Sequence, residues 1–191
     1  SGTKQLGGNI TVNDDITINS VFDASATGYS IDLKRHWSNN GTFTAQNGTV
    51  ILSGSGVNQS IGGSAVTSFN NLTLNNASGA TLNADANLIN TLVLTNGTFT
   101  VPAIRNFTLV SNATRTARIA AIAATANFSG NINMQRFLAP GPTEWRMLGS
   151  PATGTTLAQW GDDFATSGFI GSTCPPPACN WVSIWNYNEA S

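Results

Sequence analysis

The sequence predicts an all-β protein whose residues 1–132 form a parallel β-helix, or β-solenoid. Three observations predict this fold: short stretches that alternate apolar residues with threonine, turn-forming clusters between them, and a spacing near twenty residues between successive stretches. Alternation is typical of short strands with one buried face. A spacing near twenty residues is what a solenoid needs to complete one coil.

The expected strands share an apolar–x–apolar pattern. They lie at Ile10–Val12, Ile16–Ile18, Ile31–Leu33, Val50–Leu52, Leu72–Leu74, Leu92–Leu94 and Phe107–Leu109. The pairs that begin at residues 10, 31, 50, 72, 92 and 107 are separated by steps of 21, 19, 22, 20 and 15 residues. One coil cannot bury its own apolar face, whereas stacked coils bury a continuous core. The pairs therefore predict strands that stack as parallel ladders.

Two copies of the phrase Asn-Gly-Thr-Phe-Thr, at Asn40–Thr44 and Asn96–Thr100, predict places where a coil changes direction. Asn and Gly accept turn conformations, and alternation then places Phe inward between two outward Thr. Asn at equivalent turns is expected to stack in ladders. Asn-Gly is also a hairpin signal, and strand spacings of about 8–12 residues suit a β-sandwich. A hairpin-built sandwich therefore stays open as an alternative.

Composition narrows the range of partners. Charged residues make up 9% of the chain and the formal net charge is -1, against about 25% charged residues in ordinary globular proteins. The eight basic residues are scattered, so we expect no nucleic-acid partner, which needs clustered positive charge. The longest apolar run is too short for a membrane span. The chain begins at Ser1 without a signal peptide, which suggests a processed protein or a fragment.

Composition changes near residue 133. Four of the five Trp, six of the seven Pro and both Cys lie beyond it. We therefore predict a second unit over residues 133–191, a Trp- and Pro-rich, β-sandwich-like module that is cut short at its end. Just before it, Ala117–Ala126 is helix-prone by propensity but too short to stand as a helix unaided.

Cys174 and Cys179 enclose a proline-rich stretch and predict a local disulfide, which indicates an oxidising, extracellular compartment. A zinc site is disfavoured because the chain has a single His and no second Cys pair. Among the Trp residues of the second unit, Trp160 and Trp181 are candidates for contact with a glycan, because aromatic faces stack on sugar rings. Core packing is the alternative for both.

No catalytic, cofactor or metal site is predicted. The acidic pairs Asp14-Asp15 and Asp162-Asp163 are adjacent, so on a strand their side chains would point to opposite faces. Glycosidases need two opposed carboxylates, and calcium loops need spaced oxygen ligands. His36 has no partnered nucleophile motif. The Thr pairs 42/44 and 98/100 resemble those of ice-binding faces but lie 56 residues apart.

One stretch resembles a known family. Residues 41–100, GTFTAQNGTVILSGSG…TLVLTNGTFT, resemble repeats in large secreted surface proteins of the Bacteroidota, and so does SNATRTARIAAIAATANFSGNINMQRF. The resemblance covers roughly residues 40–190. It implies a β-helix-like region followed by a β-rich module, export by the type IX secretion route, and an extended rather than helical Ala117–Ala126. Members of this family are adhesin-like or structural, and the resemblance transfers no catalytic residue.

Together these observations predict a non-enzymatic, extracellular structural or adhesin-like surface protein. Its solenoid would be a stiff spacer that associates with itself, with neighbouring domains or with surface glycans, and head-to-tail stacking would make a filament. The alternative is a carbohydrate-binding module or a carbohydrate-active β-helix protein. That alternative calls for a Trp-lined groove or two facing carboxylates.

Overall fold

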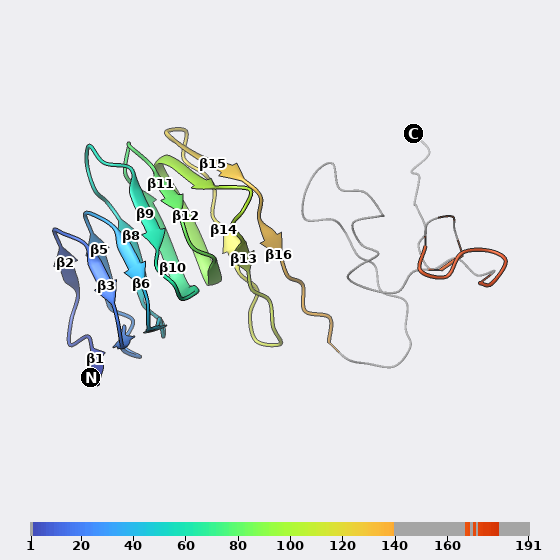
Figure 1. The fold of residues 1–191 in the computed structure, drawn as a ribbon, viewed down its shortest axis with the longest axis horizontal. Helices are drawn as coiled ribbons and strands as arrows, with labels where there is room; N and C mark the ends of the chain where they lie inside the picture. Colours follow the sequence, from blue (N-terminus) through green and yellow to red (C-terminus); the bar gives the residue numbers. More distant parts are fainter. Residues whose placement is uncertain (1, 140–166, 169, 171, 180–191) are drawn as a thin grey trace. The chain divides into compact units, whose positions relative to one another are not determined.

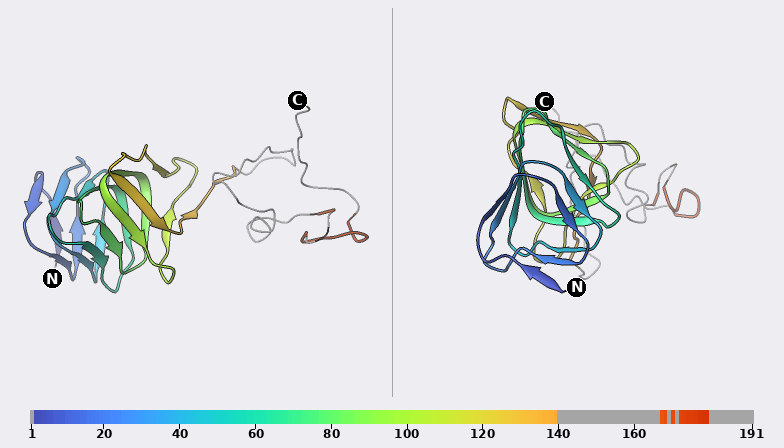
Figure 2. Two further views of the ribbon diagram at one scale, coloured as in Figure 1. Left: turned by 90° about the horizontal axis from the view of Figure 1, so that it is seen from above. Right: turned by 60° about the vertical axis from the view of Figure 1, so that its left-hand side comes forward.

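A computed structural model describes residues 2–139, 167–168, 170 and 172–179 and confirms an all-β parallel solenoid of about six coils. The chain divides into two compact units, Ser1–Pro140 and Gly141–Ser191. In the first unit the strands lie side by side and successive coils stack from one end to the other (Figure 1). Each coil closes around the core, as the right-hand view of Figure 2 shows.

Each coil contributes strands to three faces, which we number in the order the chain meets them. The first face contains β1 (Thr3–Gln5), β4 (Val21–Asp23), β7 (Thr42–Thr44), the starts of β10 (Thr67–Asn75) and β12 (Ala86–Val101), β13 (Phe107–Leu109) and β16 (Asn133–Met134). The second face contains β2 (Ile10–Val12), β5 (Ser30–Leu33), β8 (Thr49–Leu52), later parts of β10 and β12, and β14 (Arg118–Ile119). The third face contains β3 (Ile16–Ile18), β6 (Trp37–Asn39), β9 (Gln59–Gly62), β11 (Ala80–Leu82), the end of β12 and β15 (Ala126–Gly130).

The predicted apolar pairs stack as expected on the second face. Ile31, Val50, Leu72 and Leu92 lie in one register column, and each is buried. All ladders between the named strands are parallel, so the hairpin-built sandwich is wrong for this region. The pair 107/109 belongs to the first face instead, where β13 pairs with the start of β12. The short step of 15 residues is therefore a change of face.

Two aromatic clusters fill the core. Near the N-terminal end, the Trp37 ring lies 4.8 Å from Phe43 and 5.5 Å from Phe69, centroid to centroid. Near the other end, Phe99 lies 5.2 Å from Phe107 and 5.9 Å from Phe128. Large aromatic rings bury more apolar area than any other side chain, so these clusters hold successive coils together. The indole N–H of Trp37 donates to Thr67 Oγ1 at 3.2 Å, which satisfies a buried donor.

Ala117–Ala126 is not helical, and the helix propensity is overridden: the chain is extended through β14 to Ala123, as the family resemblance implies, and a turn at residues 124–125 then leads into β15. Its backbone forms hydrogen bonds with the preceding coil: Ala120 N–H donates to Leu92 O at 2.9 Å, and Ala123 N–H donates to Leu94 O at 3.1 Å. These bonds continue the solenoid, whereas a helix of this length is marginal by itself.

The solenoid continues beyond the predicted boundary at residue 133. β16 pairs with β13, and Gln135 N–H donates to Leu109 O at 3.0 Å, so residues 133–139 belong to the first compact unit. Backbone pairing continues there although the composition has already changed. Most of the expected β-sandwich-like module lies outside the described residues and stays a prediction. Within the described residues the structure has no helix of the length and apolar character that a membrane span requires.

Candidate functional site

The predicted disulfide is confirmed. Cys174 and Cys179 are bonded, with Cα atoms 5.6 Å apart, and Ala178 N–H donates to Pro175 O at 3.1 Å inside the small loop they close. The bridge fixes a local turn. The candidate glycan contacts Trp160 and Trp181 lie outside the described residues, as does the pair Asp162-Asp163.

Charged side chains of the solenoid gather at the corner between the second and third faces, in the first coils. Lys34 Nζ donates to Asp32 Oδ2 at 2.8 Å and to Ser53 Oγ at 2.9 Å, while Ser53 Oγ donates to the other oxygen of Asp32. Burial raises the pKa of Asp32, but the hydrogen bonds from Lys34 and Ser53 outweigh it and hold that pKa below its ordinary value. Asp32 is therefore ionised at neutral pH and compensates the Lys34 ammonium.

Asp14 and Asp15 lie in the corresponding turn of the preceding coil and face Arg35. Arg35 Nε is 3.4 Å from Asp14 Oδ1 and 3.6 Å from Asp15 Oδ1, and all three side chains are largely exposed. Exposed ion pairs of this kind contribute at most about 1 kcal/mol. Asp15 Oδ1 also accepts the backbone N–H of His36 at 2.9 Å, so this carboxylate shapes the next turn. Within the described residues, no group of three or more His, Cys, Asp or Glu side chains comes together as a metal site.

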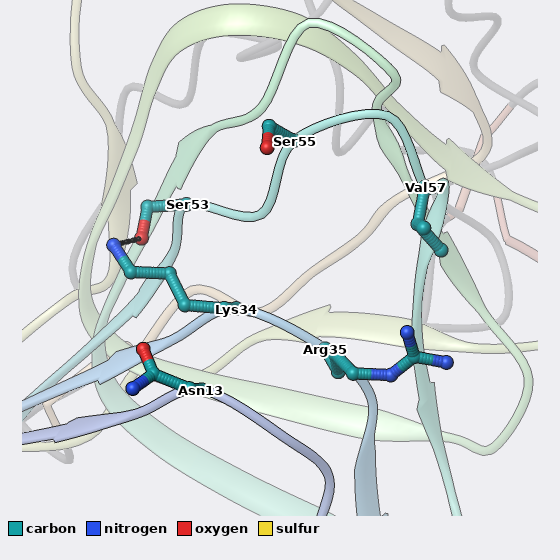
Figure 3. A pocket seen from close by; sticks show the side chains of 6 residues that line it. All are labelled: Asn13, Lys34, Arg35, Ser53, Ser55 and Val57. Atoms are coloured by element: carbon teal, nitrogen blue, oxygen red, sulfur yellow. Dashed lines mark hydrogen bonds between the residues drawn. The ribbon is translucent and has the colours of Figure 1, made fainter.

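A hollow of about 370 Å³ opens at this corner, and its lining residues form a ring around it (Figure 3). They are Asn13, Lys34, Arg35, Ser53, Ser55 and Val57. The hollow exists because the loop 53–58 is longer than the corresponding turns 13–15 and 34–36 of the two coils before it. Its side chains offer both donors and acceptors, and the charges of the two cations among them, Lys34 and Arg35, are compensated by Asp32, Asp14 and Asp15 outside the lining. This combination suits a neutral, hydroxyl-rich ligand better than an anion.

A buried polar network behind the hollow holds the long loop in place. The side chain of Gln59, fully buried, donates to Leu33 O at 3.0 Å and Arg35 O at 2.7 Å, and accepts from Gly54 N–H at 2.8 Å. Asn76 Nδ2 donates to the same Gln59 oxygen at 3.0 Å. A buried polar network stabilises a fold when its members are satisfied. This network was not predicted from the sequence, where its one sign is a Gln at an inward position of the alternating stretch Gln59-Ser60-Ile61.

A second cavity, of about 420 Å³, opens at the N-terminal end of the solenoid. Among the described residues, the strands β1, β2 and β3 of the first coil each pair with another strand on one side only. Ile10, Val12 and Ile16 are therefore only half-buried, whereas their equivalents one coil later are buried. Lys4 lies among the residues that line this cavity. We call this surface the open end.

The threonine pairs considered for ice binding lie on different faces. Thr42 and Thr44 are on the first face, and Thr98 and Thr100 are on the third, so they cannot form one row. A different hydroxyl column runs along the third face, through Ser60, Thr81, Thr100 and Ser129. It is a single row rather than a flat array. No protein-family model, curated protein or solved structure matches the chain.

Proposed function

We propose that the chain is a stiff rod segment of a non-enzymatic, extracellular structural or adhesin-like surface protein. The observation that supports this most is the continuous core, which runs through about six coils without interruption. Bending such a rod would separate strand ladders on one face and compress the close-packed core on the other. Stiffness over this length is therefore built into the fold.

Side-chain ladders along the corner between the third and first faces add bonds between coils. Asn40 Nδ2 donates to Asn19 Oδ1 at 3.3 Å, and Asn40 Oδ1 accepts from Ser64 N–H at 3.0 Å. Later coils repeat the arrangement with Asp85, Asn106 and Asn133. Apart from the Asp85 carboxylate, these ladders use side-chain amide groups and contain no ion pair, so the rod keeps its cross-links in a chain with 9% charged residues.

The extracellular location is supported by the disulfide, since such bonds persist mainly in oxidising compartments. The resemblance to Bacteroidota surface repeats adds the type IX route to the proposal. Export by that route predicts that the protein disappears from the cell surface when the type IX machinery is deleted.

Electron microscopy of native material, with antibody labelling of intact source cells, tests this function. We expect surface labelling and straight, isolated rods. Regular filaments with a repeat of one subunit would instead assign the chain to a self-assembling fibre, and purely intracellular labelling would contradict the proposal.

A second candidate function is glycan binding at the corner hollow, and the ring of donors and acceptors in Figure 3 supports it. Glycan-array binding by the full chain tests it. Binding that is lost in Arg35→Ala but kept in Arg118→Ala, a matched exposed arginine, would place the glycan in the hollow. Binding that is lost only in Trp160→Ala or Trp181→Ala would place it in the second unit.

A further inference from the structure

Three corners of the solenoid have the same triplet, Asn-Gly-Thr, which begins at Asn40, Asn47 and Asn96. An asparagine that precedes glycine is prone to lose its side-chain amide, because glycine has no Cβ to keep its backbone nitrogen away from the asparagine carboxamide. The three triplets share this local chemistry. Any difference between them in the folded chain therefore comes from the contacts of each corner.

The reaction is an attack within the chain. The glycine nitrogen bonds to the asparagine Cγ and loses its proton to solvent, while the Cγ–Nδ2 bond breaks and the side-chain nitrogen takes up a proton and leaves as ammonia. The remaining succinimide ring is then opened by water at either of its carbonyls. One product is aspartate, and the other is isoaspartate, in which the main chain runs through Cβ and Cγ. Water is the only co-reactant.

Each of the three glycine nitrogens is held by a hydrogen bond, at a distance between 2.8 and 3.1 Å. The pairs are Gly41 N–H with Asn39 Oδ1, Gly48 N–H with Ala45 O, and Gly97 N–H with Thr125 O. A local opening must therefore release the nitrogen at every corner before it can attack. This requirement slows all three sites and does not distinguish them.

The side chains of Asn40 and Asn47 are held as well. Asn40 Nδ2 donates to Asn19 Oδ1 at 3.3 Å, and Asn40 Oδ1 accepts from Ser64 N–H at 3.0 Å and from Ser64 Oγ at 3.2 Å. Asn47 Nδ2 donates to Ala26 O at 3.1 Å. These bonds tie each carboxamide to a neighbouring coil, and they must also break before Cγ can turn toward the following nitrogen.

Asn96 has no such restraint. Its carboxamide makes no hydrogen bond to any described residue, whereas its backbone carbonyl accepts Asn76 N–H at 3.2 Å. The corner lies inside the solenoid with a coil stacked on each side, because Asn96 pairs with Asn75 and Gly97 pairs with Ala126. The freedom of this side chain is therefore a property of the corner and not of a chain end.

We propose that Asn96–Gly97 is a self-modification site of the solenoid, at which asparagine converts to isoaspartate through a succinimide. Asn47 reacts more slowly and Asn40 most slowly, in the order of the side-chain bonds that must break. In isoaspartate the former main-chain carbonyl of residue 96 belongs to a side-chain carboxylate, and the main chain is longer by one carbon atom. The acceptor of Asn76 N–H is thus displaced.

The displaced bond lies next to the polar network behind the corner hollow. Asn76 Nδ2 donates to Gln59 Oε1 at 3.0 Å, and the same oxygen accepts Gly54 N–H at 2.8 Å from the long loop 53–58. A change at residue 96 thus reaches this loop through two side chains. We therefore expect modified chains to lose hydrogen-exchange protection first at the amides of Asn76 and Gly54.

Peptide mapping of the full chain by mass spectrometry tests the proposal. The chain is kept in mildly alkaline buffer, either folded or unfolded in denaturant, and the conversion of each asparagine is followed with time. In denaturant the three triplets should react at similar rates. In the folded chain all three should slow, and Asn96 should convert at least about tenfold faster than Asn40, where several hydrogen bonds must break first.

Two variants separate the side-chain effect from other causes. Asn19→Ala removes the partner of Asn40 Nδ2 at an exposed position, so it should raise the conversion of Asn40 severalfold and leave that of Asn96 unchanged. Asn96→Asp supplies a carboxylate on an unaltered main chain. Hydrogen exchange at Asn76 should therefore stay native in Asn96→Asp and rise in the isoaspartate form, which peptide fragmentation distinguishes from aspartate.

Several outcomes would overturn the proposal. They are equal rates at the three triplets in the folded chain, a fastest reaction at Asn40 or Asn47, absence of conversion at Asn96, and conversion of Asn40 that ignores Asn19→Ala. Native exchange at Asn76 in chains that carry isoaspartate would overturn the link to the polar network.

Discussion

Asn40–Thr44 and Asn96–Thr100 have the same five residues but lie on different faces of the solenoid. The first phrase enters β7 on the first face, and the second forms the last part of β12 on the third face. In both, Phe points into the core: Phe43 is 8% exposed and Phe99 is fully buried. A third Asn-Gly-Thr, at residues 47–49, enters β8 on the second face.

The comparison shows that the phrase marks a corner and not a particular face. What the corners share is close contact between coils. A Cβ at Gly41 would collide with the backbone of Ser20, and one at Gly97 with the carbonyl of Asn76 in the coil below. They differ in backbone conformation, because Gly97 has a φ of 82° whereas Gly41 is not among the residues with positive φ.

Replacing the aromatic residue of each phrase should have the largest effect. Phe99→Ala and Phe43→Ala each remove a ring from a packed cluster and should cost about 3–5 kcal/mol of unfolding free energy. Phe99→Ala should cost more, because its ring is fully buried between Phe107 and Phe128. Denaturant unfolding of both variants measures the difference. A larger cost for Phe43→Ala would show that burial does not rank the two sites.

Glycine can be required at a corner for two reasons: a neighbouring backbone lies too close for a Cβ, or φ is positive. A series of glycine variants separates these two reasons. Gly41→Ala tests close approach alone, and Gly56→Ala, with a φ of 71° and open space around it, tests conformation alone. Gly97→Ala combines both and should be the worst, at more than about 2 kcal/mol, since positive φ by itself costs about 1–2 kcal/mol. Melting temperatures give the order. Gly7 has neither a close contact nor a positive φ, so Gly7→Ala should leave the melting temperature nearly unchanged. An equal loss of stability in all four variants would contradict this separation.

The asparagines of the two phrases should differ by a smaller amount. The Asn40 side chain bonds to the coils on both sides, whereas Asn96 accepts Asn76 N–H through its backbone carbonyl, which alanine retains. Asn40→Ala should cost about 1 kcal/mol, the usual value for such bonds, and Asn96→Ala less. Hydrogen exchange of the Ser64 amide should rise only in Asn40→Ala. A greater loss of unfolding free energy in Asn96→Ala than in Asn40→Ala would mean that the side-chain bonds of Asn40 add no stability.

The smallest effect concerns pH and the hydrogen bonds between Asp85 and Asn106, which lie along the same corner between the third and first faces. Asn106 donates its backbone and side-chain N–H to Asp85, which holds the pKa of Asp85 below its ordinary value of 3.8. The stabilisation is therefore complete above pH about 4 and is lost as pH falls through the lower, folded-state pKa. Asp85→Asn should flatten the pH dependence of unfolding below pH about 4. Asn106→Ala should flatten it less, because alanine keeps the backbone N–H that lowers the pKa of Asp85 most, and an unchanged slope in Asp85→Asn would contradict the assignment.

Alternation and spacing are local properties, and they were sufficient to predict strands at the alternating stretches and the inward Phe of each phrase, and to favour parallel stacking over hairpins. The strands β1, β4, β6 and β9 lack the apolar–x–apolar pattern and were not predicted. The sequence did not reveal which face Phe107–Leu109 joins or where the solenoid ends, since both depend on pairing with residues about one coil away. The place of Lys4 was also hidden. Its neighbours Thr3 and Gln5 are polar, so only pairing with Phe22 shows that it faces inward.

The corner hollow was missed for a related reason. Its lining residues come from three successive coils, and only the unequal lengths of their turns create the space. Gln59 was the one available clue, because a polar residue at an inward position needs several partners. Three of those partners are backbone groups, two from the preceding coil and one from the loop that leads to Gln59, and such groups leave no trace in a single sequence.

The parallel ladders also determine how the solenoid responds to a pulling force. The hydrogen bonds between coils run along the stacking direction, so tension along that direction opens them a few at a time instead of shearing all of them together. Each coil that detaches releases about twenty residues, which extend to roughly 60–70 Å at about 3.3–3.6 Å per residue. A solenoid that resists bending would thus lengthen stepwise under load, by several nanometres for each coil that detaches.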